Sequence, residues 1–288
     1  MAFKKGTFYA CKVNVHEMIY NYDITIAKKK IAEAIMNYRG HTIHEGNSEW
    51  TFAEVKKLTA FNRRFIVGIL ARGKDEKMKK LEDQKLEPVI FEKKASESRF
   101  VYCPDTEILV FQEIMNKISA NQFIEYFNRL INRIDEKIGR LEIIVLKKSK
   151  ELKQEILELE KILAVEFNLI VPNYSDSDEI NKIRKLINDA QMKKFNSRAE
   201  NFNEGLKLKN RNSDNISENT IIGDQINATI QGYGEGKITG YTRVEGMKEI
   251  HTQNRLLIEH VFYDDEIDLQ DKMIRILLKA QESRNIKI

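Results

Sequence analysis

The chain has 288 residues, with 48 Lys and Arg against 44 Asp and Glu, so its formal net charge is +4 at pH 7. A hydrophobic fraction of 42% and a charged fraction of 32% are typical of a soluble, folded protein with one large or two medium domains. Two cysteines exclude a disulfide framework and indicate buried thiols in a reducing compartment. An N-terminus without an apolar segment predicts a cytoplasmic protein with no membrane span.

The positive charge is concentrated near the N-terminus. Residues 1–80 carry 16 Lys and Arg against 8 Asp and Glu, residues 81–116 carry 4 against 8, and residues 117–288 carry 28 of each. A basic segment of this kind is the electrostatic signature of a surface that binds a polyanion. The alternative is a set of solvated lysines whose acidic partners come from other parts of the chain.

Residues 1–116 predict a basic α+β domain. A helix is expected at about 25–38, where Gly40 ends it. Strands are expected at 7–15, about 50–60, about 64–72, 88–93, 99–103 and 107–112. The β-α-β-β start is the first half of a ferredoxin-like arrangement. The charged stretch 73–87 predicts an exposed helix or a mobile connection.

Residues 117–288 predict a second α+β domain. The clearest helix is 120–138, where Ser119 and Gln122 form a capping-box pattern and Gly139 ends the helix. Further helices are expected at 150–163, 179–194 and 268–282, and strands at 141–146, 165–171 and 256–263. Residues 195–220 predict a long polar loop. The predicted fold class is α+β, in which mixed or antiparallel sheets carry helices on one face in two ferredoxin-like halves.

A glycine-rich stretch, residues 221–246, contains six of the thirteen glycines. Residues that favour strands alternate on both sides of the glycines, which predicts a C-terminal β-hairpin with a bulged tip. The G-x-G-x-G run at 232–236 is not a phosphate-binding loop, because no amphipathic helix follows and Gly236-Lys237 precedes isoleucine. The hairpin is a candidate docking edge, with Tyr233, Lys237 and Tyr241 as the contacts to a partner.

Aromatic and basic side chains are interspersed in the N-terminal half. The aromatic residues are Tyr20, Tyr22, Trp50, Phe61 and Phe65. The candidate nucleic-acid contacts are Lys28, Lys29, Lys30, Lys56, Lys57, Arg63 and Arg64. Such a combination on a sheet is typical of surfaces that bind RNA or single strands, although core packing explains aromatic residues in strands equally well.

Catalytic and metal signals are weak. Glu92 and Lys94 form the E-x-K pattern of magnesium-dependent nucleases, with Asp75 or Asp83 upstream, but this pattern arises often by chance in a chain so rich in Lys and Glu. The histidines do not cluster, except His41 and His44 in one predicted loop. We therefore expect no cofactor and no metal site, and the sequence favours a non-catalytic protein over an enzyme.

Three segments carry a family resemblance: RFVYCPDTEILVFQ, SANQFIEYFNRLI and NATIQGYGEGKITGY. Together they are similar to uncharacterised bacterial proteins found near phage-defence genes. The resemblance covers most of the chain, transfers no catalytic residue, and implies a cytosolic component of an antiviral system. The predicted function is a non-catalytic, nucleic-acid-binding component of a bacterial defence or mobile-element system, with a protein partner or a second copy. The alternatives are a scaffold subunit that docks through the glycine-rich hairpin and a metal-dependent nuclease.

Overall fold

The computed structural model describes residues 3–15, 24–82, 85–139, 141–172, 178–190, 192, 194–207 and 220–284. The chain divides into two compact units. Unit 1 contains Met1–Tyr9, Tyr20–Arg140 and Glu259–Arg275, and unit 2 contains Ala10–Ile19, Leu141–Ile258 and Ile276–Ile288. The division falls after residue 140, and not at the expected residue 116, because the helix that follows Ser119 packs on the strands of unit 1. The described residues form six α-helices and twelve strands, which confirms the α+β class.

Unit 1 is organised around one large sheet. Its strands are β1 (Lys4–Val15), β2 (Ile43–Glu45), β3 (Ser48–Ala60), β4 (Arg63–Glu82), β5 (Lys85–Cys103), β6 (Ile108–Glu113) and β12 (Ile258–Tyr263). Their order across the sheet is β12-β1-β6-β5-β4-β3-β2. The β3-β4-β5-β6 run is a meander in which each strand pairs antiparallel with the next. The sheet is therefore larger than its β-α-β-β start predicts.

Helices lie on both faces of this sheet. The helices of unit 1 are α1 (Ile24–Met36), α2 (Ala120–Ile134), the 3-10 turn η1 (Glu136–Ile138) and the first part of α6 (Glu266–Arg284). On one face, Phe123 of α2 stacks on Phe111 of β6 with ring centroids 4.0 Å apart. Arg99 precedes Phe100 in β5 and therefore points to the opposite face, where it pairs with Glu266 of α6 at 2.5 Å. The aromatic side chains thus form the core between the sheet and α2.

The predicted capping box at the start of α2 is confirmed. The Ser119 Oγ accepts a hydrogen bond from the Gln122 backbone N–H at 3.3 Å, and the Gln122 Oε1 accepts one from the Ser119 N–H at 3.1 Å. These two bonds satisfy backbone donors that the first turn of a helix leaves without intrahelical acceptors.

Replacement of Ser119 by alanine removes the acceptor for the Gln122 N–H. We expect Ser119→Ala to lower the free energy of unfolding by about 1 kcal/mol, measured by urea denaturation. Ser119→Asp is the matched control, because aspartate caps helices as well as serine does and retains most of the stability. Equal stability of wild type and Ser119→Ala would show that the cap contributes nothing.

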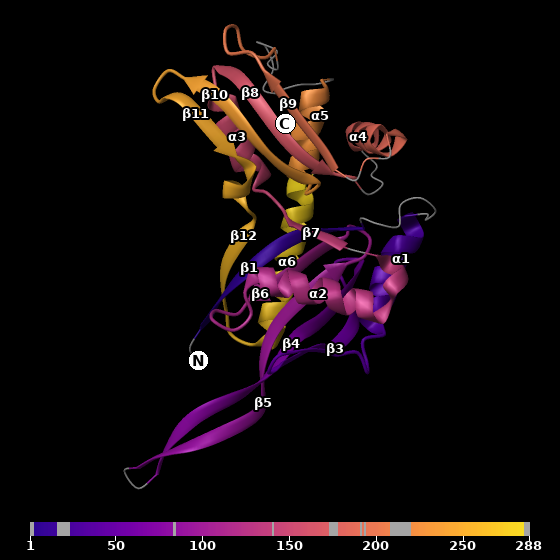
Figure 1. The fold of residues 1–288 in the computed structure, drawn as a ribbon, viewed down its shortest axis with the longest axis vertical. Helices are drawn as coiled ribbons and strands as arrows, with labels where there is room; N and C mark the ends of the chain where they lie inside the picture. Colours follow the sequence, from indigo (N-terminus) through magenta and orange to yellow (C-terminus); the bar gives the residue numbers. More distant parts are fainter. Residues whose placement is uncertain are drawn as a thin grey trace. The chain divides into compact units, whose positions relative to one another are not determined.

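The expected helix or mobile connection at 73–87 is wrong. β4 runs to Glu82 and β5 begins at Lys85, and their pairing extends as far as Glu82 with Lys85. β3 pairs with β4 only as far as Lys74, so the two strands continue past the sheet as a ribbon, which Figure 1 shows. The high charge of this stretch is compatible with either a helix or a strand. It forms a strand because residues 88–93 lie directly opposite it and pair with it.

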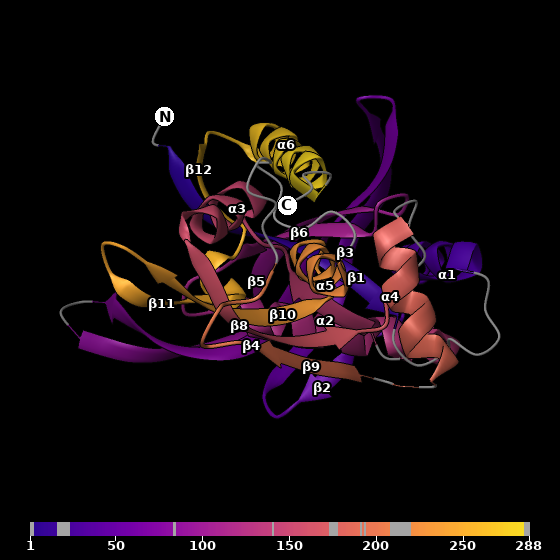
Figure 2. The ribbon, with the colours of Figure 1, turned by 90° about the horizontal axis from the view of Figure 1, so that it is seen from above.

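Unit 2 is built on a second, four-stranded antiparallel sheet. Its strands are β8 (Lys161–Ile170), β9 (Lys194–Glu200), β10 (Gly234–Thr242) and β11 (Gly246–His251), in the order β11-β10-β8-β9. The other elements are β7 (Leu141–Val145), α3 (Ser149–Glu158), α4 (Asp178–Asp189), α5 (Ile221–Ile230) and the 3-10 turn η2 (Thr252–Arg255). β7 pairs with residues 11–15 of β1. Figures 1 and 2 show α3 and α5 on one face of the four-stranded sheet, and the buried residues of these helices and of α4 form a core with it.

The predicted hairpin over 221–246 is correct only in its second part. Residues 221–230 form the helix α5, which Thr220 caps, and the hairpin that follows joins β10 to β11. The glycines between helix and strand permit close backbone contact: a Cβ on Gly232 would lie 2.8 Å from the Lys12 Cβ. The expected polar loop at 195–220 contains the edge strand β9, and residues 208–219 lie outside the described part of the chain.

Candidate nucleic-acid interface

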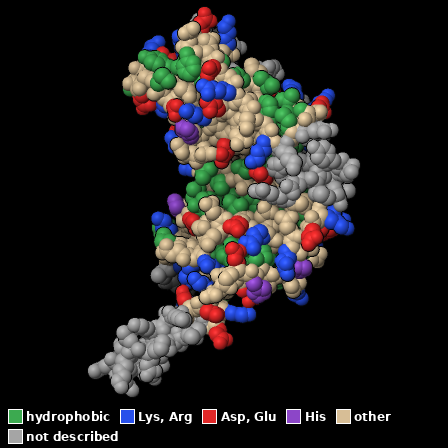
Figure 3. All heavy atoms as spheres, viewed as in Figure 1, with side chains coloured by type: hydrophobic (Ala, Val, Ile, Leu, Met, Phe, Trp, Pro, Cys, Tyr) green, Lys and Arg blue, Asp and Glu red, His purple; other side chains and the backbone are tan. Residues whose placement is uncertain are grey.

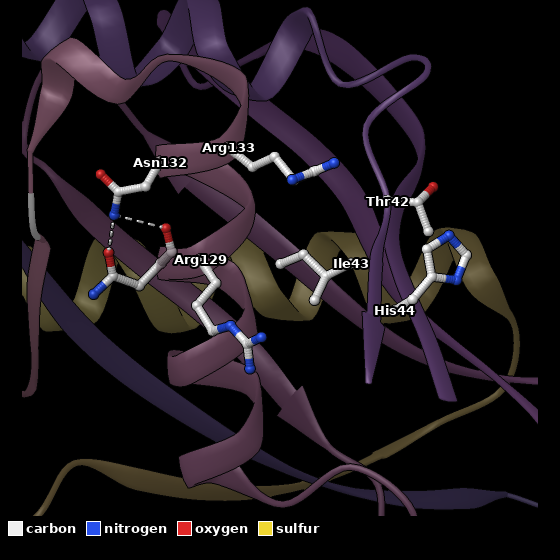
Figure 4. A pocket seen from close by; sticks show the side chains of 7 residues that line it. Thr42, Ile43, His44, Arg129, Asn132 and Arg133 are labelled. Atoms are coloured by element: carbon white, nitrogen blue, oxygen red, sulfur yellow. Dashed lines mark hydrogen bonds between the residues drawn. The ribbon is translucent and has the colours of Figure 1, made fainter. Parts of the chain in front are cut away.

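A pocket of about 590 Å³ lies in unit 1 between α2 and the short strand β2. It is lined by Thr42, Ile43, His44, Asn128, Arg129, Asn132 and Arg133. Figure 4 shows the Arg129 and Arg133 side chains extending from α2, with Thr42 and His44 on the opposite side. We call this the α2–β2 pocket. Its lining is polar and basic, with one apolar side chain, Ile43.

A stack of aromatic rings supports one of these arginines from below. Trp50 of β3 and Tyr126 of α2 are buried and stack with ring centroids 3.8 Å apart. The Arg129 guanidinium lies over the outer face of Tyr126, with its Cζ 4.9 Å from the ring centroid. The Cζ of Arg72 lies 5.2 Å from the centroid of the Trp50 ring. Such cation–π contacts orient a guanidinium without neutralising its charge.

Carboxylates hold Arg129 in place as well. Glu45 at the end of β2 forms an ion pair with Arg129 and accepts a hydrogen bond from the Tyr126 hydroxyl at 2.7 Å, and Glu125 pairs with Arg129 at 3.3 Å. The hydrogen bonds from Tyr126 and Arg129 lower the pKa of Glu45. The hydrogen bond to Glu45 raises the pKa of the Arg129 guanidinium. Arg129 is therefore rigidly oriented and largely charge-compensated.

Arg133, one helical turn further along α2, has no such compensation. Its side chain is exposed, and among the described residues no carboxylate lies within 4.0 Å of it. Beside it, the Asn132 Nδ2 donates to the Asn128 backbone oxygen at 3.0 Å and to the Asn128 Oδ1 at 2.8 Å. These bonds use both N–H groups of the Asn132 amide and order the helix face beside Arg133. The group in the pocket that suits an oxyanion such as phosphate is therefore the Arg133 guanidinium.

The folded unit loses most of the basic excess that residues 1–80 have in sequence. Unit 1 contains 26 Lys and Arg against 24 Asp and Glu, a net charge of +2. Acids of β5, β6, α6 and the turn between β5 and β6 offset these cations in number, and Arg64 forms an ion pair with Asp105 of that turn at 3.3 Å. On the face seen in Figure 3, basic and acidic side chains are interspersed. In net charge, acidic residues from other parts of unit 1 therefore offset much of the N-terminal excess, as the alternative interpretation of the sequence expects.

The seven predicted nucleic-acid contacts do not form one patch. In α1, Lys29 is exposed and pairs with Glu33 at 3.6 Å, Lys30 is half-buried, and the Lys28 side chain lies outside the described residues. In the β3–β4 hairpin, Lys57 pairs with Ile66 in register and Lys56 with Val67, so these lysines point to opposite faces. Arg63 and Arg64 differ in the same way, because they are adjacent in β4.

Most of the aromatic residues belong to the core and not to a binding surface. Trp50 and Phe65 are buried, whereas Phe61 is exposed at the β3–β4 turn under the Arg275 guanidinium. Tyr20 and Tyr22 lie outside the described residues. The core alternative is therefore correct for Trp50 and Phe65.

The three predicted docking residues do not lie on an exposed sheet edge, as was expected. Tyr233 is buried, and the Lys237 Nζ pairs with Glu249 at 2.6 Å. β10 pairs with β8 on one side and β11 on the other, so it has no free edge for a partner strand. Only Tyr241 is exposed, directly opposite the exposed Met247 and near Val244. The physical reason is that β10 is an inner strand of the sheet.

The nuclease candidates lie on the exposed β4–β5 ribbon. Lys94 pairs with Glu76 at 2.5 Å, and the Asp75 Oδ1 accepts a hydrogen bond from the Lys93 backbone N–H at 2.9 Å. Glu92 is exposed, and Asp83 lies outside the described residues. Among the residues that the structure describes, no group of three His, Cys, Asp or Glu side chains is placed to hold a metal ion. Lys94 and Asp75 therefore make contacts within the ribbon and are not arranged as a metal site.

The lining residues of the α2–β2 pocket were missed in the sequence, apart from His44. The signal was present in the predicted helix, where Asn128 and Asn132, and Arg129 and Arg133, recur at i, i+4 on its polar face. That spacing predicts two pairs of neighbouring side chains. It does not predict which strand faces them, and β2 is only three residues long.

Comparison with known protein families covers nearly the whole chain. Residues 7–279 match a family described as a domain of unknown function, DUF4747. The chain belongs to the DUF4747 family. A comparison of the chain with curated proteins found no match. No helix in the described ranges is both long and apolar enough to cross a membrane.

Proposed function

We propose that this protein binds the phosphate backbone of nucleic acid at the α2–β2 pocket. The observation that supports the proposal is Arg133, an exposed guanidinium that extends into a polar pocket and has no carboxylate within 4.0 Å among the described residues. An arginine side chain presents a planar set of donors that matches two phosphate oxygens at once.

The neighbouring groups have complementary roles in this proposal. Arg129 is fixed by Glu45 and by its stack on Tyr126, so it contacts a second phosphate oxygen with little loss of side-chain entropy. The Asn132 Nδ2 is engaged by Asn128, so its Oδ1 is the atom that can accept a hydrogen bond from a sugar hydroxyl or a base amino group. The pocket has no exposed aromatic ring on which a base could stack, since Trp50 and Tyr126 are buried. Phosphate contacts therefore dominate, and binding is largely independent of base sequence.

Two of the cations predicted from sequence share a sheet face with α2. Leu70 lies directly opposite Phe52, which contacts Phe127 of α2, so Leu70 faces α2. Every second residue of β4 lies on that same face, and this series includes Ile66 and Arg64. Lys57 lies opposite Ile66 and therefore shares the face. Arg64 lies six residues along β4 from Leu70, roughly 20 Å away. We include Lys57 and Arg64 as distal contacts of a longer nucleic acid, and not Lys56 or Arg63 on the other face.

The wider role that we propose is a cytoplasmic, non-catalytic component of a bacterial antiviral or mobile-element system that acts with a protein partner. Its support is the sequence resemblance to proteins found near phage-defence genes, together with two buried free thiols. Phosphate-backbone binding fits such a role because it holds nucleic acid whatever its sequence, while the protein partner supplies the selection.

Charge removal at Arg133 tests the proposal. Arg133→Gln keeps hydrogen-bonding capacity but removes the uncompensated charge, so we expect an increase in Kd of about tenfold, which corresponds to ~1.4 kcal/mol. The slope of log K against log salt should fall by about one unit. Fluorescence anisotropy with labelled single-stranded RNA, single-stranded DNA and duplex DNA over a salt series measures both quantities.

Arg243→Gln is the matched control. Arg243 in unit 2 is 86% exposed and pairs with Glu160, so its replacement removes the same charge without touching the pocket. We expect its Kd to equal that of the wild type. No binding by the wild-type protein at low salt, or equal losses for Arg133→Gln and Arg243→Gln, would rule out this site.

A further inference from the structure

A second pocket of unit 1 lies beside the N-terminal end of α2. It has a volume of about 700 Å³ and is lined by residues of β1, β4, β6, β12, the β6–α2 loop and α2. We call it the β1–β6–α2 pocket. It is separate from the α2–β2 pocket, because its α2 residues are in the first turn, whereas Asn128 to Arg133 occupy the last turns.

Three cations line this pocket: Lys5 of β1, Arg72 of β4 and Lys117 of the β6–α2 loop. Arg72 donates to two neutral acceptors, the Ser48 Oγ at 3.2 Å and the Lys117 backbone oxygen at 2.8 Å. Lys5 and Lys117 are exposed. Among the described residues, none of the three has a carboxylate oxygen within 4.0 Å. Lys117 is also attracted to Glu76, whose pKa is lowered first by its hydrogen bond from Lys94 and then by the charges of Lys94 and Lys117. The three cations remain open to a ligand, because none of them is held in a close ion pair among the described residues.

The single carboxylate that lines the pocket is already engaged. The Glu113 Oε2 accepts a hydrogen bond from the Tyr9 hydroxyl at 3.2 Å, and its Oε1 accepts one from the Ala120 backbone N–H at 3.2 Å. Glu113 thus ties β6 to the first turn of α2. The lining keeps a net charge of +2, because three cations oppose one carboxylate.

Hydrogen bonds on both sides hold the pocket wall in shape. In the β6–α2 loop, the Ile114 and Ile118 backbones exchange hydrogen bonds, each 2.9 Å long, and Asn116 adopts φ +60° at the turn. This tight turn fixes the backbone that carries Lys117. On the other side, the Gln112 Nε2 donates to the Tyr263 hydroxyl at 3.2 Å. A site whose lining is already ordered binds its ligand without the entropic cost of arranging it.

We propose that the β1–β6–α2 pocket binds a phosphorylated small molecule of nucleotide size. Lys5, Arg72 and Lys117 match the two to four negative charges of a nucleoside polyphosphate. The amide and hydroxyl groups of Gln112, Gln122 and Tyr263 supply donors and acceptors for its base or sugar. The volume lies within the range of about 300 to 1,000 Å³ that is usual for small-molecule sites. The proposal does not depend on nucleic-acid binding at the α2–β2 pocket.

Titration of the full chain with ATP, AMP and inorganic phosphate, each without divalent cations, tests this proposal. Isothermal calorimetry measures affinity, and the fluorescence of Trp50, the single tryptophan, reports the site because the Arg72 guanidinium lies over its ring. We expect saturable binding of ATP, weaker binding of AMP and the weakest binding of phosphate. The double variant Lys5→Gln/Lys117→Gln should raise the Kd for ATP roughly tenfold or more, since each lysine contributes a charge-assisted hydrogen bond.

Lys56→Gln is the matched control. Lys56 is an exposed strand residue of the same unit that lies outside this pocket, and we expect its variant to bind ATP as the wild type does. Circular dichroism of each variant separates loss of binding from loss of folding. Absence of ATP and AMP binding to the wild-type protein, or wild-type affinity in a folded double variant, would overturn the proposal. Equal affinity for ATP and inorganic phosphate would contradict the proposal that the ligand is of nucleotide size, because the pocket would then bind only a simple anion.

The Arg133→Gln variant separates the two proposals. It should retain wild-type affinity for ATP while losing affinity for nucleic acid, because Arg133 does not line the β1–β6–α2 pocket. If Arg133→Gln weakened ATP binding as strongly as Lys5→Gln/Lys117→Gln does, ATP would be bound at the α2–β2 pocket and the second site would be refuted.

Discussion

Replacement of Gly234 by alanine is expected to destabilise unit 2 by about 3 kcal/mol or more, the range of strain combined with a buried backbone clash. Gly234 has φ +151°, and a Cβ at this position would lie 2.3 Å from the Asn168 backbone oxygen and 2.9 Å from the Leu169 Cα. Gly234 pairs directly with Leu169 of β8, so neither strand can move away without breaking the sheet. Urea denaturation followed by circular dichroism measures the loss.

Gly246→Ala is the matched control for this effect. Gly246 also has a positive φ, of +74°, but a Cβ there would meet no atom within 4 Å. Its replacement carries only the conformational cost of a left-handed alanine, about 1 kcal/mol. If Gly234→Ala were no more destabilising than Gly246→Ala, the close approach of β10 to β8 would not be what requires glycine.

Replacement of Phe123 by alanine should have a comparable effect on unit 1. Phe123 is fully buried in α2, stacks on Phe111 at 4.0 Å, and also packs on Phe127 with ring centroids 5.6 Å apart. Removal of the ring loses its transfer free energy and leaves a cavity between α2 and the sheet, which costs about 3 to 5 kcal/mol. A lowered midpoint of urea denaturation, with an unchanged slope, is the expected result.

Two variants calibrate this result. Phe123→Leu keeps most of the buried volume and should cost about half as much or less. Phe3→Ala truncates a phenylalanine of the same unit that is 67% exposed, and we expect a change within about 0.5 kcal/mol. Similar losses for Phe123→Ala and Phe3→Ala would show that the aromatic contacts of α2 do not stabilise unit 1. Because α2 supports both pockets, nucleic-acid and ATP binding should weaken in Phe123→Ala only as the protein unfolds.

Local signals in the sequence predicted α2 well. Ser119 and Gln122 mark its start, and Phe123, Phe127 and Leu130 recur on one face, so both the cap and the buried stripe were found where expected. These features depend on residues at most a few positions apart, which is why periodicity and capping chemistry suffice to predict them. The same reasoning correctly predicted strands around Phe8, Phe65 and Leu109.

Other features depended on partners that are distant in sequence. The charged stretch 73–87 became strand because 88–93 folds back beside it, and residues 221–230 became helix although Ile226, Ala228 and Ile230 alternate as in a strand. In that helix, all three of these side chains are buried against the core of unit 2. Alternation over a few residues does not distinguish a buried helix from a strand, since both are apolar on the sides that face the core.

By itself, the sequence determined the α+β class, the capped amphipathic helix α2, and the i, i+4 spacing of Arg129 and Arg133. Only the tertiary structure decided which of the cations stay unpaired. Glu45 of β2, Asp105 of the β5–β6 turn and Glu266 of α6 form ion pairs with cations of unit 1. Arg133 and Arg72, by contrast, have no carboxylate within 4.0 Å among the described residues. The physical reason is that ion pairs form over a few ångströms in space, and neighbours in space come from strands that the sequence separates by tens of residues.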